Sequence, residues 1–342
     1  MHAGTATNAN SGTATVAAAD AGTWKLGDLE VNRLGFGALR LTGNGMGGGS
    51  DGPPIDRERA IGLLRSAVEH GVNHIDTAAF YFSPLRSANE LINRALSPYP
   101  DDLVLVTKVG PGRDPSGAWL PMARPEQLRG QVEENLRQLG RDHLDVVNLR
   151  RNGITSIAEH FGALAELREA GLIRHLGLSS VTPGHLAEAQ AIAPVVCVQN
   201  CYGLDQRTAD TNGLLDLCRR QGIAFVPFFA ISGHQREASA VDTHDDNLRA
   251  IARAHDATPA QIRLAWTLHR GPHVLAIPGT SDPRHLTENI AAGALRLSAT
   301  DLDCLDGLGT LDGPDGAGRS DGSDGRGSSK ATGWQRTWGP SL

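Results

Sequence analysis

The sequence VNHIDTAAFY, residues 72–81, is an apolar strand that ends in an acid and then a phenol. Asp76 and Tyr81 stand at the point where such a strand leaves the core. The next apolar run, residues 103–109, carries Lys108 near its own end. A charged side chain at the end of a buried strand is costly unless it pairs with another charge or takes part in chemistry. We therefore expect Asp76, Tyr81 and Lys108 to share one pocket.

Strands and helices alternate on both sides of this stretch. Apolar strands that alternate with amphipathic helices are typical of a parallel sheet covered by helices. Eight such units predict a closed (β/α)8 TIM barrel, and a doubly wound open sheet is the alternative. The expected strands are residues 33–41, 72–81, 103–109, 145–150, 175–180, 195–200, 224–229 and 274–278. The expected helices are residues 56–70, 88–96, 125–139, 158–170, 183–192, 210–220 and 246–269.

The two ends of the 342-residue chain differ in composition from its body. We expect a flexible N-terminal tail at residues 1–24, the barrel at residues 25–312, and a flexible C-terminal tail at residues 313–342. The C-terminal tail is rich in Gly, Asp and Ser, which bury too little apolar surface to fold alone. Residues 1–22 lack the basic start and the apolar run of a secretory signal.

Charge and cysteine usage exclude several classes of protein. The net charge of −6 and a pI near 6.1 argue against a nucleic-acid-binding domain, which usually carries a basic stripe. No apolar run approaches the roughly 20 residues that span a bilayer. The four cysteines form no Cys-x-x-Cys pair and no set with zinc spacing, so no metal site is expected. We expect a cytoplasmic protein, and its oligomeric state is left open.

Lysine is rare in this sequence. Only Lys25, Lys108 and Lys330 are present, against 29 arginines among 32 basic residues. Lys108 is thus either an amine that must pair or titrate, or a chance survivor. An ammonium group beside a carboxylate stays charged and favours the ionised form of a nearby phenol, so that Tyr81 could donate a proton to a carbonyl oxygen. The alternative is a structural Asp76–Lys108 ion pair with Tyr81 filling the barrel mouth.

Several motifs in order along the chain resemble the aldo-keto reductase family. They are residues 33–37 (RLGFG), 74–78 (HIDTA) with Tyr81, 107–108 (TK), 177–180 (GLSS), 198–202 (VQNCY), 277–280 (IPGT) and 288–289 (EN). The resemblance covers residues 25–309 and implies an NADPH-dependent carbonyl reductase. It implies that the catalytic residues include Asp76, which tunes Lys108, and Tyr81, which protonates the carbonyl while the nicotinamide supplies hydride.

The resemblance also implies which residues bind the cofactor. Ser179 or Ser180 and Gln199 would contact the nicotinamide amide, and Tyr202 would stack on its ring. Near the eighth strand, a helix N-terminus would hold phosphate, with cationic side chains adding charge. The remaining positions of the expected cofactor site are Pro227, Gly279, Thr280, Ser281, Arg284, His285, Glu288 and Asn289, with the last two near the adenine. Without the resemblance, Thr280 would be a plain helix cap and Gln199 a polar strand end.

One departure from the family pattern concerns the fourth strand. The family usually places a histidine after leucine there, whereas this chain has Arg150 after Leu149. A guanidinium group stays charged and only donates hydrogen bonds, so we expect a more electropositive pocket. Arg150 could hold the substrate oxygen, bind an acidic group of the substrate through a bidentate fork, or pair with a local acid at the expense of carbonyl reduction.

The leading hypothesis is an NADP-dependent oxidoreductase that reduces a small aldehyde or ketone, with an acidic group on the substrate if Arg150 binds one. Two alternatives are an NADP(H)-binding regulatory protein with weak catalysis and a lyase or epimerase that retains its cofactor. The preference for NADPH over NADH is left open, because Gly279 and His285 stand where the family often has lysine or arginine.

Overall fold

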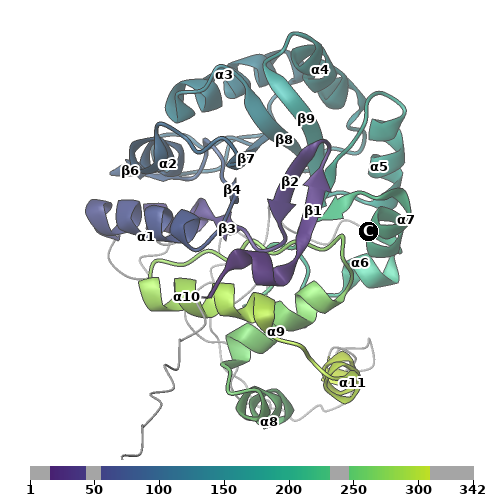
Figure 1. Cartoon of the computed structure of the whole chain (residues 1–342). Helices are drawn as coiled ribbons and strands as arrows, with labels where there is room; N and C mark the ends of the chain where they lie inside the picture. Colours follow the sequence, from purple (N-terminus) through teal and green to yellow (C-terminus); the bar gives the residue numbers. More distant parts are fainter. Residues whose placement is uncertain (1–15, 44–54, 232–245, 309–342) are drawn as a thin grey trace, which may run out of the picture.

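The computed structural model describes residues 16–43, 55–231 and 246–308. The expected C-terminal tail at residues 313–342 lies outside the described residues, as do residues 1–15 of the expected N-terminal tail. Most of the described chain forms a ring of helices around a curled parallel sheet (Figure 1).

The central sheet has its strands in the order β11-β10-β9-β8-β7-β4-β3, and all of its pairs are parallel. Residues 274–276 close the gap between the two edge strands, because Leu275 N donates to Phe225 O at 2.9 Å and Ala276 N donates to Arg33 O at 2.8 Å. The predicted (β/α)8 barrel is confirmed. The strands are β3 (Phe36–Gly37), β4 (His74–Asp76), β7 (Val104–Val109), β8 (Leu144–Arg150), β9 (Ile173–Ser179), β10 (Cys197–Gln199) and β11 (Ala224–Phe225).

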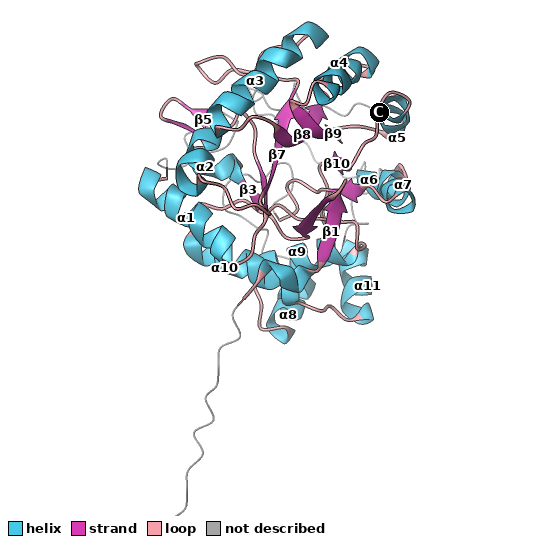
Figure 2. Ribbon diagram, turned by 45° about the horizontal axis from the view of Figure 1, so that its top comes forward, coloured by secondary structure: helices cyan, strands magenta, loops and turns pink. Residues whose placement is uncertain are grey.

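Helices cover the outside of the barrel, and the turned view shows them surrounding the strands (Figure 2). The helices bury apolar faces, as α1 does with Ile61, Leu64 and Ala67. The helices are α1 (Arg57–Glu69), α2 (Ala88–Leu96), α3 (Leu128–Leu139), α4 (Ala158–Glu169), α5 (Pro183–Gln190), α6 (Thr208–Thr211), α7 (Leu214–Gln221), α8 (Asp246–Ala254), α9 (Pro259–His269), α10 (Pro283–Ala291) and α11 (Ala299–Leu308). Short 3-10 helices are η1 (Ala18–Ala21), η2 (Ala38–Thr42), η3 (Pro125–Gln127) and η4 (Ala292–Ala294).

A hairpin of β1 (Thr23–Leu26) and β2 (Leu29–Asn32) lies across the amino-terminal end of the barrel (Figure 1). Its Leu26 and Val31 are fully buried. They pack in one apolar cluster with inward-facing strand residues, among them Val104, Val146 and Leu275. The hairpin therefore closes this end of the barrel.

Two local expectations are corrected by the structure. Residues 18–24 do not belong to a tail, because Ala18 and Ala21 are buried and Ala18 N donates to His70 O at 2.9 Å. The expected first strand, residues 33–41, is shorter, since residues 38–42 turn into η2. A small hairpin of β5 (Phe82–Ser83) and β6 (Arg86–Ser87), which the sequence pattern did not predict, follows residues 72–81.

Alternation along β7 decides which side chains reach the barrel interior. Val104 and Val106 belong to the inner cluster, whereas Leu105 and Val109 belong to the layer beneath the helices. Because side chains alternate along a strand, Lys108 continues the inward series. The strand thus carries apolar side chains at its amino-terminal end and one amine at its carboxyl-terminal end.

Candidate active site

Two buried charges meet at the carboxyl-terminal end of the barrel. Asp76 ends β4, and Lys108 lies near the end of the neighbouring strand β7. The Nζ atom of Lys108 donates to Oδ1 of Asp76 at 2.5 Å and to the carbonyl oxygen of Thr77 at 3.0 Å. Asp76 and Lys108 are each 4% exposed. The pair is therefore shielded from water, and loss of either member would leave an uncompensated buried charge.

The same ammonium group lies beside the phenol of Tyr81. Its Nζ atom is 4.9 Å from the centroid of the Tyr81 ring, and Tyr81 is buried. Burial by itself would lower the pKa of Lys108. The charges of Asp76 and Tyr81, together with side-chain hydrogen bonds to both, outweigh burial and hold the pKa of Lys108 above its usual value. Lys108 is thus a cation at neutral pH, placed against the phenol.

Arg150 adds a second cation from the end of β8. Its guanidinium carbon lies 5.5 Å from the ring centroid of Phe80 and 5.2 Å from that of Trp119. Burial lowers the pKa of Arg150 to about 10, and the charges of Tyr81 and Asp76 oppose that shift. The group therefore stays charged at neutral pH, in contact with two aromatic rings. The structure brings all four predicted catalytic residues to one end of the barrel.

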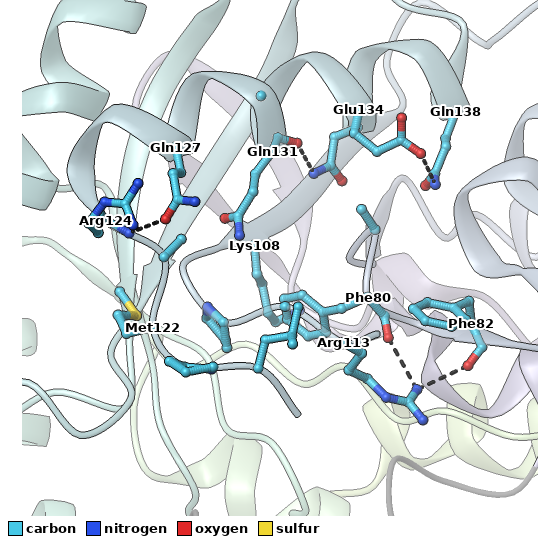
Figure 3. Close-up of a pocket in the computed structure, with 18 residues that line it drawn as sticks. Phe80, Phe82, Lys108, Arg113, Met122, Arg124, Gln127, Gln131, Glu134 and Gln138 are labelled. Carbon is cyan, nitrogen blue, oxygen red and sulfur yellow. Dashed lines mark hydrogen bonds between the residues drawn. The ribbon is translucent and has the colours of Figure 1, made fainter. Parts of the chain in front are cut away.

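Arg113 connects the two loops that carry these aromatic rings. One of its terminal nitrogens donates to the carbonyl oxygens of Phe80 at 3.4 Å and Phe82 at 3.0 Å (Figure 3). Its Nε atom donates to the carbonyl oxygen of Gly117 at 2.8 Å. The guanidinium also lies over the rings of Phe82 and Trp119. No sequence motif surrounds Arg113, so its role was not predictable from the sequence.

A cavity of about 800 Å³ lies between these loops and helix α3. Figure 3 shows Lys108 and Phe80 on one side of it and the polar side chains of α3 on the other. The Gln131 amide there is satisfied by the main chain of Gly110, at 2.7 Å and 3.2 Å. The cavity adjoins the buried charges without enclosing all of them.

Gln199 links the end of β10 to the ion pair. Its Nε2 atom donates to Oδ2 of Asp76 at 2.8 Å, and the residue is 1% exposed. Its Oε1 atom is buried and has no hydrogen-bond partner within residues 16–43, 55–231 and 246–308. The buried Oγ atom of Ser180 likewise has none there. Ser180 has φ 62°, a left-handed conformation that is uncommon for serine and recurs at functional sites.

Ser179 is buried at the end of β9, where it is paired with Arg150 across the sheet. Ser179, Ser180 and Gln199 therefore lie at the ends of the adjacent strands β9 and β10, and Gln199 reaches Asp76. Unpaired buried acceptors and hydroxyls suit a ligand group that both donates and accepts hydrogen bonds, such as a carboxamide.

Tyr202, which was expected to stack on the nicotinamide ring, lies in the core instead. It is fully buried, its ring stacks on Trp266 at 5.8 Å, and its hydroxyl donates to Oδ1 of Asp210 at 3.0 Å. Its ring therefore offers no free face to a nicotinamide, and the predicted stacking role is corrected. Two half-buried rings follow β11, Phe228 and Phe229, and the main-chain nitrogen of Phe228 donates to Asn200 O at 3.0 Å. The aromatic pair at the end of the seventh expected strand, residues 224–229, was the available signal for them.

The loop before α10 is held by a local network. Thr280 Oγ1 accepts from Asp282 N at 3.0 Å, and Asp282 caps the helix by accepting from Arg284 N at 2.8 Å. Thr280 is buried, whereas Ser281 is exposed. An acidic cap already occupies the helix N-terminus, so a phosphate group there depends on nearby cations as well as on main-chain N–H groups.

Two exposed side chains on the first turn of α10, Arg284 and His285, are such cations or potential cations. Arg284 Nε lies 3.9 Å from Oε1 of Glu288, so the pair is a weak surface contact. Asn289 is buried at 5% exposure, which leaves little of it for a ligand. Pro227 is also buried, next to Phe228 at the end of β11.

Two other classes of site are absent from the described residues. No group of three or more His, Cys, Asp or Glu side chains there is arranged to hold a metal ion. None of the helices in the same residues combines the length and the apolar character that a membrane crossing requires.

The chain is similar to known proteins along most of its length. The model of the aldo/keto reductase family matches residues 33–309. The pyridoxine 4-dehydrogenase of Escherichia coli strain K12 is 46% identical over 293 residues, which cover 84% of this chain and 98% of that protein.

Two solved structures extend the comparison. A thermostable aldo-keto reductase, Tm1743, solved with the inhibitor epalrestat, has a TM-score of 0.70 and 31% identity, and the match covers 84% of this chain and 99% of that one. An aldo-keto reductase from Klebsiella pneumoniae solved with NADPH has a TM-score of 0.66 and 27% identity, covering 82% and 91%. The barrel, its charged carboxyl-terminal end and these similarities together show that the chain belongs to the aldo/keto reductase family of oxidoreductases.

Proposed function

We propose that the protein reduces an aldehyde or ketone to an alcohol with NADPH, and that Tyr81 donates the proton to the carbonyl oxygen. The observation that carries the proposal is the position of the Lys108 ammonium group, which lies against both Asp76 and the Tyr81 ring. A buried cation favours release of the phenolic proton. Asp76 keeps the lysine charged and oriented, because both are buried and bonded at 2.5 Å.

The cofactor proposal rests on the strand ends beside Asp76. When NADPH is bound, its nicotinamide supplies the hydride. Ser180 Oγ and Gln199 Oε1 are buried without partners in the described part of the chain, and they would hold the carboxamide. Ser179, at the end of β9, is the third proposed contact of the carboxamide. The half-buried ring of Phe228 replaces Tyr202 as the proposed platform for the nicotinamide.

The remainder of the cofactor would lie along the loop before α10. Arg284 and His285 are exposed there, and Arg59 of α1 adds a third basic side chain, with its nitrogen 4.0 Å from Asp282. Such a basic edge suits the extra phosphate of NADPH, which the Klebsiella pneumoniae relative binds. The proposed phosphate and adenine contacts are Gly279, Thr280, Ser281, Arg284, His285, Glu288 and Asn289.

Arg150 is the proposed donor to the substrate. Its pKa of about 10 keeps it charged at neutral pH, and the guanidinium lies against the rings of Phe80 and Trp119, which also contact each other at 5.6 Å. A guanidinium can donate to the carbonyl oxygen and to a neighbouring acidic oxygen at once. Flat walls favour a planar compound. The Escherichia coli relative is a pyridoxine 4-dehydrogenase, so pyridoxal, an aromatic aldehyde with an acidic hydroxyl beside the carbonyl, is the first proposed substrate.

The test measures NADPH consumption with pyridoxal and with a panel of simple aldehydes and ketones. We expect Tyr81→Phe to lower kcat by about 10²- to 10⁴-fold, the usual contribution of a general acid, without weakening NADPH binding. Tyr99→Phe is the matched control, because the Tyr99 hydroxyl donates to the carbonyl oxygen of Leu139, outside the site. Full activity in Tyr81→Phe would show that the proton comes from another group.

The same assay separates the two alternatives. A regulatory protein would bind NADPH tightly and turn over no member of the panel at a useful rate. A lyase or epimerase that retains its cofactor would form product without net NADPH consumption, which chromatography of the products detects. Arg150→His then tests the substrate contact: we expect it to lower kcat/KM for pyridoxal more than for benzaldehyde, which lacks the acidic hydroxyl.

A further inference from the structure

Four buried polar side chains form a series of hydrogen bonds between the central sheet and helices α2 and α3. Thr77 Oγ1 donates to Oδ1 of Asn89 of α2 at 2.7 Å, and Asn89 Nδ2 donates to Oδ1 of Asn135 of α3 at 2.9 Å. Thr107 Oγ1 of β7 donates to the same Asn135 oxygen at 2.6 Å. All four residues are fully buried. Water cannot replace these bonds, so the loss of one leaves a buried polar group unpaired.

Both ends of this series reach Lys108. The carbonyl oxygen of Thr77 accepts from the Lys108 ammonium group at 3.0 Å. Thr107 directly precedes Lys108 on β7, and the alternation of the strand points their side chains to opposite faces of the sheet. The bonds therefore close a ring, whose members are Lys108, Thr77, Asn89, Asn135 and Thr107. This ring fixes both the main chain that carries the ammonium group and one of the acceptors that the group binds.

Helix α3 holds the same strand a second time, one turn before Asn135. Gln131 accepts from Gly110 N at 2.7 Å and donates to Gly110 O at 3.2 Å. Asn135 Nδ2 donates to the carbonyl oxygen of Gln131 at 2.8 Å. Figure 3 shows the Gln131 side chain extending from α3 toward the strand that carries Lys108. The chain is therefore anchored to α3 on both sides of Lys108, at Thr107 and at Gly110.

We propose that Asn135 is a positioning residue for proton transfer, because it joins the two threonines that set the place of the Lys108 ammonium group. It acts through Lys108, whose Nζ atom is 4.9 Å from the centroid of the Tyr81 ring. Displacement of a catalytic group by about 1 Å can lower a rate by about 10²-fold. The expected effect on turnover rests on the proposed function, whereas the expected effect on the position of Lys108 does not.

The kinetic test removes one hydroxyl at a time and leaves Asn135 in place. Thr77→Val and Thr107→Val should each lower kcat, counted per NADPH-binding site, by about 10- to 10²-fold. The KM for the aldehyde and the Kd for NADPH should stay within about twofold of the wild-type values. Since both hydroxyls belong to one ring, the double variant should lose little more than either single variant, whereas independent losses would multiply. Thr107→Ser, which keeps the hydroxyl, should recover most of the activity.

A second readout observes Lys108 directly and needs no turnover. The other lysines of the chain are Lys25 and Lys330, so Lys25→Arg with Lys330→Arg leaves Lys108 as the single lysine. With isotope-labelled lysine, its ammonium group should give one side-chain NMR signal whose protons exchange slowly with water, because the group is buried and hydrogen-bonded. Thr107→Val in this background should shift the signal and speed the exchange by about three- to tenfold, the range of one hydrogen bond.

The matched control is Thr267→Val, the same substitution at another fully buried threonine. Thr267 Oγ1 donates to the carbonyl oxygen of Arg263 within α9, which lies across the barrel from α3 (Figure 1). This variant should leave both kcat per binding site and the Lys108 signal unchanged.

The outcomes separate the positioning role from a purely structural one. An equal fall in kcat for Thr107→Val and Thr267→Val, or multiplied losses in the double variant, would overturn the proposal. So would a Lys108 signal that Thr107→Val leaves unchanged, whether or not a carbonyl is reduced. A shifted Lys108 signal in a protein that reduces no carbonyl would support the ring and count against the proposed function alone. Should Thr107→Val fail to fold, Thr77→Val tests the other side of the ring by the same two readouts.

Discussion

The two ends of the barrel are built from the same strands but have opposite character. At the amino-terminal end, the β1–β2 hairpin covers an apolar cluster in which Leu26 and Val31 are fully buried. At the carboxyl-terminal end, Asp76, Lys108 and Arg150 are also buried, yet each carries charge. The contrast agrees with the general division in such barrels, in which one face stabilises the fold and the other performs chemistry.

The difference teaches that burial alone does not identify a role. Val104 and Lys108 stand on one strand and are both at most 4% exposed. Burial of Val104 stabilises the fold through removal of apolar surface, whereas burial of Lys108 costs free energy that its pairing with Asp76 offsets. Substitutions at the two ends should therefore separate stability from activity.

The largest effect is expected from Lys108→Met. It should lower kcat by about 10²- to 10⁴-fold, because the phenol loses its cation, and it should destabilise the fold by about 3–5 kcal/mol, because Asp76 becomes an unpaired buried charge. Urea unfolding and steady-state kinetics measure the two. The double variant Asp76→Asn with Lys108→Met should recover stability but no activity; recovery of activity would disprove the role of the cation.

Leu26→Ala should destabilise the apolar cluster at the amino-terminal end of the barrel. Loss of a fully buried leucine from the cluster should cost about 2–5 kcal/mol of unfolding free energy. At temperatures where the variant is folded, kcat should equal that of the wild type, because the hairpin lies at the far end of the barrel. Leu29→Ala, at a partly buried position of the same hairpin, should cost less. A fall in kcat of the folded Leu26 variant would mean that the two ends are coupled.

His74 should make stability depend on pH. Burial lowers its pKa from 6.5 to about 4, so the folded state keeps it neutral. Between these values the unfolded chain binds the proton and the folded chain does not, so stability is complete above pH 6.5 and falls as the pH drops toward 4. The difference corresponds to about 3 kcal/mol. Chemical unfolding across this range should show a smaller fall of the unfolding free energy with falling pH for His74→Leu than for the wild type; an equal fall would mean that another group controls it.

The smallest effect is expected from Arg113→Ala. Without its bonds to the Phe80 and Phe82 carbonyl oxygens, the aromatic walls beside Arg150 should lose their fixed position. We expect KM for the aldehyde to rise by about tenfold, with NADPH affinity and kcat nearly unchanged. Arg124→Ala is the control, since this exposed residue of the same loop pairs with Glu126. An equal rise in KM for Arg113→Ala and Arg124→Ala would show that Arg113 does not hold the aromatic walls specifically.

The strand ends were predictable from the sequence because apolar strands alternate with amphipathic helices along the chain. Apolar runs that stop at Asp76, Lys108 and Arg150 give both the parallel strands and the edge at which their ends meet. The pairing of Asp76 with Lys108 then follows from the cost of burying single charges, and the structure places them 2.5 Å apart.

Contacts between loops were not predictable in the same way. The β5–β6 hairpin, α2 and β7 lie between Phe80 and Trp119, and no sequence periodicity relates the two rings to Arg150 or Arg113. Tyr202 follows the end of β10 by three positions, where the chain has left the alternation of the strand, and its ring turns under Trp266. The assignment of roles to the remaining cofactor residues stays a prediction.

The scarcity of lysine determines how the protein can be attached to a solid support through its amines. Of the two lysines in the described residues, Lys25 is exposed on the amino-terminal hairpin and Lys108 is buried in its ion pair. Of these two amines, reagents that attack amino groups should therefore modify Lys25 and spare Lys108. With Lys330→Arg and the α-amino group blocked, a support that captures Lys25 would hold each barrel with its carboxyl-terminal mouth facing the solution.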